Sequence, residues 1–108
     1  MQRPPAADGR SDGAGTTVIT GAASGIGLAV ATQLVREGAR VVGVDWDAAG
    51  LDRAASALGE AFAPLHGDAG DPATHERAAD LAESAGRLAG WVNNAGIDVV
   101  GGAHAVTP

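Results

Sequence analysis

Eight residues near the start of the chain, Thr20–Gly27 (TGAASGIG), have the types and spacing best suited to chemistry. Glycines occupy the second, sixth and eighth places of this stretch. A β-branched run, residues 16–20, leads into it, and a segment with helical apolar periodicity, residues 26–37, leads out. A glycine turn between strand and helix lets backbone N–H groups approach a phosphate, and the helix dipole favours negative charge there. The stretch therefore predicts a site for the diphosphate of a dinucleotide.

An acidic residue, Asp45, ends the next apolar run and lies 18 residues beyond Gly27. A carboxylate in this place accepts hydrogen bonds from the adenosine ribose hydroxyls and repels a 2′-phosphate. Its position therefore favours NAD over NADP as the cofactor. The other interpretation of Asp45 is structural, as a cap on the turn that follows its strand.

Further polar residues follow the third and fourth predicted strands. Asp68 is either an acceptor for the adenine amino group or a solvated loop carboxylate. Asn93 and Asn94 end the fourth strand, where amide side chains satisfy loop backbone groups and also bridge strand and cofactor. Both functions of the Asn pair are compatible.

These residues need a scaffold that brings them together, and the pattern of the chain predicts one. We expect strands over 16–20, 40–45, 61–66 and 88–93, separated by helices over 26–37, 48–58 and 72–85. Strands alternating with helices pair in parallel through right-handed crossovers. The predicted fold is therefore α/β: a three-layer, Rossmann-like, partial doubly wound parallel sheet of strand order 3-2-1-4. The glycine turn and the Asn93 loop then meet at the carboxyl edge, between the first and fourth strands.

Single residues refine this scaffold. Ile26, Val30 and Leu34, widened by Ala29, are predicted to form one face of the first helix. Asp47 and the pair Asp71-Pro72 are predicted to start the second and third helices. Pro64 cannot donate to a strand ladder, which places the third strand at an edge of the sheet. Trp91, in the fourth strand, is expected in the core.

The bulk properties of the chain exclude several classes of function. Its 108 residues suffice for one domain, with a disordered tail predicted over residues 1–15 and the domain over 16–108. A net charge of −6 argues against nucleic acid or anionic membrane as a partner. Cysteine is absent and His66, His75 and His104 lack ligand spacing, so no metal site is expected. No apolar run is membrane-length and no signal peptide is evident, which favours the cytoplasm.

The motifs together resemble the N-terminal half of a short-chain dehydrogenase/reductase. The matching residues are Thr20-Gly21-x-x-x-Gly25-x-Gly27, Asp45, Asp68-Ala69 and Asn93-Asn94-Ala95-Gly96. The resemblance implies an oxidoreductase that moves a hydride between nicotinamide and a carbonyl or secondary alcohol. It also implies that the diphosphate lies against five residues: Gly21, Ser24, Gly25, Ile26 and Gly27.

The same resemblance assigns the remaining cofactor contacts. Asp45 would bind the adenosine ribose, and Asp68 and Ala69 the adenine. The family members that use NADP often carry basic residues where this chain has Ser24 and Trp46, which supports NAD. Trp46 is then available to cover the adenine edge. The fourth strand would be stabilised, and the ribose side flanked, by Asn93, Ala95 and Gly96.

The catalytic residues of the family have no counterpart here. The chain contains no Tyr, and all of its seven basic residues other than His are Arg, so a Tyr-x-x-x-Lys motif is impossible. The family's catalytic Ser motif is missing as well. We therefore assign no catalytic residue and expect no turnover from this polypeptide alone, with a carbonyl or alcohol substrate only for a longer version.

The end of the chain also suggests a part of a larger protein. Thr107-Pro108 has the form of a helix start, with no helix after it, so the domain is expected to be incomplete at its C-terminus. Two alternatives stay open: a non-catalytic dinucleotide-binding module, and a non-functional gene fragment. The sequence makes no prediction about oligomeric state.

Overall fold

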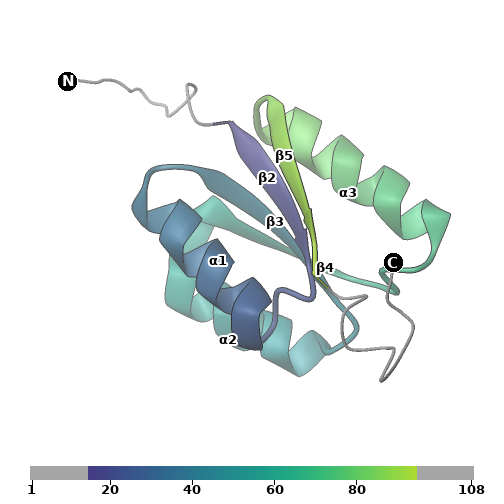
Figure 1. Ribbon diagram of the computed structural model, residues 1–108, viewed down its shortest axis with the longest axis horizontal. Helices are drawn as coiled ribbons and strands as arrows, with labels where there is room; N and C mark the ends of the chain where they lie inside the picture. The colour runs from purple at the N-terminus through teal and green to yellow at the C-terminus, as the bar shows by residue number, and fades with distance from the viewer. Residues whose placement is uncertain (1–14, 95–108) are drawn as a thin grey trace.

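The computed structural model describes residues 15–94 (Figure 1). The predicted tail, apart from Gly15, lies outside the described residues, as do Ala95, Gly96, His104 and Thr107-Pro108. Gly15 belongs to the fold, because it is buried and its carbonyl oxygen accepts a hydrogen bond from the Arg40 amide at 3.1 Å.

Seven regular elements and one short 3-10 turn alternate along the described chain. They are β2 (Thr16–Thr20), α1 (Gly25–Arg36), β3 (Arg40–Asp45), α2 (Ala48–Leu58), η1 (Gly59–Ala61), β4 (Phe62–His66), α3 (Pro72–Ala85) and β5 (Leu88–Asn93). The four strands form one parallel sheet in the order β4-β3-β2-β5. This is the predicted order 3-2-1-4, and the predicted α/β fold is confirmed. Among the described helices, none is long and apolar enough to cross a membrane.

The helices cover both faces of the sheet, with α1 and α2 on one side and α3 on the other (Figure 1). Neighbouring residues of β2 divide between these layers, because side chains alternate along a strand. Ile19 packs with residues of α1 and α2, and Val18 packs with Ala78 and Ala82 of α3. Two apolar clusters therefore form, one on each face of the sheet, which is the three-layer arrangement.

Local signals set the ends of the helices as predicted. The Asp47 carboxylate accepts from the Gly50 amide at 3.0 Å and caps α2. The Asp71 carboxylate accepts from the Ala73 amide at 3.0 Å, with Pro72 in the first turn of α3. Pro64 lies in β4, which is an edge strand and pairs only with β3 among the described elements.

The predicted apolar face of α1 is wrong in part. Ile26 is 70% exposed and Ala29 is exposed, whereas Gly27 and Ala31 are the buried residues of this helix. The helix turns its small residues inward because its first turn lies directly against the backbone of the glycine turn. The larger Val30 and Leu34 are partly buried and pack against the core cluster that contains Ile19.

Trp91 is also placed differently from the prediction. It is 36% exposed, because β5 is the other edge of the described sheet and pairs only with β2. Its ring lies against the ring of His75 on α3, with the centroids 5.4 Å apart.

Candidate cofactor-binding site

The glycine turn between β2 and α1 rests on the end of β3. Gly21, at φ 71°, and Ala22 both donate their amides to the carbonyl oxygen of Val44, at 2.8 and 3.2 Å. Ala23 donates its amide to the Asp45 carboxylate at 2.9 Å. The first three amides of the turn are therefore committed to β3.

The next four amides, of residues 24–27, have no hydrogen-bond acceptor within the described part of the chain. The first amides of an α-helix have no intrahelical acceptor. In α1 the first α-helical bond is donated by the Leu28 amide to the Ser24 carbonyl oxygen, at 3.3 Å. Ser24, in an extended conformation, makes no side-chain cap bond, so its hydroxyl adds a further donor. Residues 24–26 are exposed and Gly27 is buried behind them. Free amides and a helix dipole at this point form an arrangement suited to a phosphate.

Gly27 allows the close approach that builds this turn. A Cβ on Gly27 would lie 2.0 Å from the carbonyl oxygen of Gly21 and 2.9 Å from the Asn94 Nδ2. The requirement for glycine here is thus spatial. Gly21 and Gly25 differ from it, because their positive φ values of 71° and 60° are what L side chains disfavour.

The end of β5 is joined to the turn by a small polar network. Asn94 donates its backbone amide to the Thr20 hydroxyl at 2.9 Å and its side-chain Nδ2 to the Gly21 carbonyl at 3.3 Å. The Thr20 hydroxyl donates in turn to the Asn93 Oδ1 at 3.1 Å. The predicted convergence of the turn and the Asn93 loop at one edge is therefore found in the structure.

Sequence reasoning assigned Asn93 a cofactor contact, named Asn94 as its neighbour at the strand end, and gave Thr20 no contact of its own. The structure brings all three together, with Asn94 making the direct contact to the turn. The sequence signal for this network is a hydroxyl at the end of one strand and an Asn pair at the end of another. The signal is informative only when the register is known, which places Thr20 opposite Asn93.

Asp45 lies between the turn and the start of α2. Its Oδ2 accepts from the Ala23 amide and its Oδ1 from the Asp47 amide, each at 2.9 Å. The capping interpretation of Asp45 is thus correct. An ionised carboxylate has about four lone-pair sites, so the half-buried group keeps capacity for ribose hydroxyls.

Trp46 is 72% exposed beside Asp45. Its ring lies 5.9 Å from that of His66, which neighbours Asp45 across the sheet. The His66 Nε2 is 3.0 Å from the Trp46 carbonyl oxygen and must carry the proton, because a carbonyl only accepts. An aromatic face is therefore held out to solvent at the carboxyl edge.

The loop after β4 contains Asp68 and Ala69. Asp68 is exposed, and its Oδ1 accepts from the Gly70 amide at 2.8 Å. The Ala69 carbonyl oxygen accepts from the Nε2 of His75 on α3. The loop is ordered by its own bonds, and its Asp68 carboxylate keeps further acceptor capacity toward solvent.

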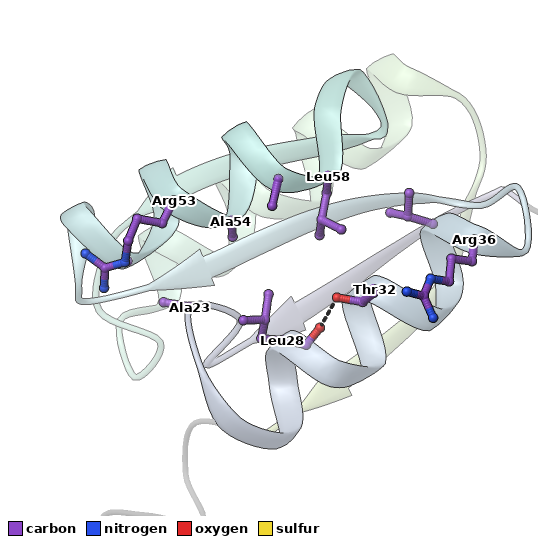
Figure 2. A pocket seen from close by; sticks show the side chains of 10 residues that line it. Ala23, Leu28, Thr32, Arg36, Arg53, Ala54 and Leu58 are labelled. Atoms are coloured by element: carbon purple, nitrogen blue, oxygen red, sulfur yellow. Dashed lines mark hydrogen bonds between the residues drawn. The ribbon is translucent and has the colours of Figure 1, made fainter.

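A hollow of about 590 Å³ lies elsewhere, between α1 and α2 (Figure 2). Leu28 and Leu58 belong to its apolar wall, and Arg36 and Arg53 are part of its lining. Only Ala23 of the glycine turn reaches this hollow. The candidate site is therefore defined by the free amides at the carboxyl edge. In residues 15–94, no cluster of three or more potential metal ligands occurs.

Comparison with known proteins identifies the family. Residues 15–108 match the family described as short chain dehydrogenase. The chain is 43% identical over 89 residues to galactitol 2-dehydrogenase (L-tagatose-forming) of Cereibacter sphaeroides, covering 82% of this chain and 35% of that protein. It is 41% identical over 87 residues to meso-2,3-butanediol dehydrogenase of Serratia marcescens, covering 78% and 34% respectively. The chain belongs to the short-chain dehydrogenase family, and it spans about a third of the length of these relatives.

Solved structures agree with this assignment. The crystal structure of 3-ketoacyl-(acyl-carrier-protein) reductase from Brucella melitensis complexed with NADH has a TM-score of 0.61 and 37% identity, covering 66% of this chain and 29% of that one. A short chain dehydrogenase from Bacillus anthracis has a TM-score of 0.68 at 27% identity, covering 76% and 35%. The chain thus has the Rossmann-like fold of part of the short-chain dehydrogenase family.

Proposed function

We propose that the chain binds NAD at the carboxyl edge of its sheet and forms the NAD-binding part of a short-chain dehydrogenase. The observation that carries this proposal is the set of four amides over residues 24–27 that have no acceptor within residues 15–94, which offers donors to a diphosphate. Asp45 then receives the adenosine ribose. The adenine lies near Trp46 and the Asp68-Ala69 loop.

The preference for NAD over NADP follows from charge. A 2′-phosphate bound to the ribose would lie next to the Asp45 carboxylate, whose oxygens are oriented by two backbone amides. Ser24 and Trp46 bring no positive charge to offset that repulsion. The proposed contacts of Asn93, Ala95 and Gly96 with the ribose side complete the cofactor site.

For the whole protein we propose hydride transfer with a small carbonyl or secondary-alcohol substrate, in the cytoplasm. NAD, when bound, supplies the hydride chemistry, and the protein supplies position and a proton donor. This chain has the residues for positioning but no Tyr or Lys for the proton. We therefore expect this polypeptide to hold the cofactor without oxidising or reducing a substrate.

The same absence favours a second candidate, a non-catalytic dinucleotide-binding module. The two candidates share the binding step, which calorimetric titration of NAD into the folded chain measures directly. We expect saturable heat at millimolar NAD or below and no change of NADH absorbance with ketone or alcohol substrates. A folded chain that releases no heat with millimolar NAD overturns the proposed binding.

A further inference from the structure

The turn is anchored to β3 by two kinds of bond. Gly21 and Ala22 donate to the Val44 backbone carbonyl, which no side-chain substitution removes. Among these bonds to β3, only that of the Ala23 amide is made to a side chain, the Asp45 Oδ2 at 2.9 Å. Ala23 is only 7% exposed and immediately precedes Ser24, the first residue with a free amide.

The Asp45 carboxylate is itself fixed from the other side. Its Oδ1 accepts from the Asp47 amide at 2.9 Å, at the start of the connection to α2. Packing adds to this constraint, since a Cβ on Gly50 of α2 would lie 2.9 Å from the Ala23 Cβ. The Asp45 carboxylate therefore has a fixed orientation, and it links β3 to the turn that contains the free amides.

We infer that Asp45 is a positioning residue for the diphosphate as well as the acceptor for the ribose. The inference rests on the proposed function, because both groups belong to NAD. The carboxylate fixes the Ala23 peptide and thereby the direction of the Ser24 amide and those after it. A ligand that lacks the ribose hydroxyls is then still sensitive to Asp45.

The negative charge of Asp45 and its bond to Ala23 have opposite effects on diphosphate binding, so the two effects can be separated by experiment. A carboxylate near a diphosphate repels it, so loss of the negative charge by itself strengthens binding of an anionic ligand. Loss of the Ala23 anchor weakens it. Asp47 provides a control of the same charge two residues away, because its carboxylate caps α2 through the Gly50 amide and lies 4.0 Å from Arg53 of that helix.

The test uses ADP and 2′,3′-dideoxyadenosine diphosphate, which keeps the diphosphate and lacks the ribose hydroxyls. Calorimetric titrations compare wild type, Asp45→Ala and Asp47→Ala. We expect the Kd of the dideoxy ligand to rise about fivefold in Asp45→Ala, as for loss of a charged hydrogen bond, and to stay level or fall in Asp47→Ala. If Asp45→Ala binds the dideoxy ligand as tightly as Asp47→Ala and loses affinity for ADP alone, Asp45 acts only on the ribose and the inference is overturned.

A second measurement needs no variant. Amide hydrogen exchange followed by NMR in the wild-type chain should be at least about tenfold slower for Ala23 than for Ser24, because only the Ala23 amide is bonded. Equal exchange rates would overturn the inference. A folded wild-type chain that binds neither NAD nor ADP overturns the proposed function and this inference together, whereas binding of both with equal effects of the two Asp variants overturns the inference alone.

Discussion

Asn94 donates a hydrogen bond from its Nδ2 to the carbonyl oxygen of Gly21, across 3.3 Å and 73 positions of sequence. The bond joins the end of β5 to the turn that begins the candidate site. The same Nδ2 would lie 2.9 Å from a Cβ on Gly27. The turn, the first turn of α1 and the end of β5 therefore meet at one point, and substitutions there test how the site is built.

Gly27→Ala should lower the free energy of unfolding by about 3 kcal/mol and abolish NAD binding, because the new methyl group meets the Gly21 carbonyl oxygen at 2.0 Å. Urea denaturation and calorimetry measure the two effects. Gly38→Ala, at the end of α1, is the control, since Gly38 has φ 93° with open space around it and its substitution should lower the free energy of unfolding by only about 1 kcal/mol. Similar losses for both variants would contradict the close-approach argument.

Thr20→Val should lower the free energy of unfolding by about 2 kcal/mol, because it removes the hydroxyl that accepts from the Asn94 amide and donates to the Asn93 Oδ1. Thr17 lies on the same strand, and its hydroxyl has no hydrogen-bond partner within residues 15–94. Thr17→Val should therefore change stability by less than about 0.5 kcal/mol. Chemical denaturation distinguishes them, and an effect of equal size in the two variants would count against the network.

Asp45→Ala should weaken the binding of NAD by about tenfold and the binding of NADP by much less, because the 2′-phosphate of NADP adds a charge that the lost carboxylate would have repelled. Calorimetric Kd values for both cofactors give the ratio. Asp52, exposed on α2, provides a charge-matched control, and Asp52→Ala should leave both values unchanged. An equal loss for NAD and NADP would rule out the ribose assignment.

The fluorescence of Trp46 can be used to detect binding of the adenine. Trp91→Phe leaves Trp46 as the single Trp of the chain, and its fluorescence should be quenched by NAD and by ADP as the purine stacks on the exposed indole. Nicotinamide mononucleotide, which has no adenine, should leave it unchanged. Trp46→Phe, which retains Trp91, serves as the converse control. Constant Trp46 emission at NAD concentrations that saturate the calorimetric signal would exclude the stacking.

Much of the fold was predictable because its signals are local. Asp47, and Asp71 with Pro72, mark helix starts through bonds made within a few residues, and the structure contains those bonds. Pro64 excludes its strand from the sheet interior by lacking a donor. The alternation of strands and helices indicates parallel pairing through right-handed crossovers, and the Rossmann-like arrangement gives the order 3-2-1-4.

The parts that were not predictable depend on contacts between distant segments. The inward face of α1 is set by the close approach of Gly27 to Gly21, so the apolar periodicity of the helix misplaced Ile26. The partial exposure of Trp91 is different, because the predicted order 3-2-1-4 already places its strand at an edge of the described sheet. Which amides of the turn stay free is decided by Val44 and Asp45 on a neighbouring strand, which no local pattern of the turn reveals.

The central place of β2 in the sheet has a consequence for synthesis of the chain. β2 is the first of the described strands to leave the ribosome, but one of its two partners, β5, is made more than 70 residues later. Until then a nascent chain can pair β2 only with β3, and Asn94 is not there to close the glycine turn. The first strand therefore gains its second partner only when the last strand has been made, and the candidate site becomes complete only at the final step of assembling these four strands.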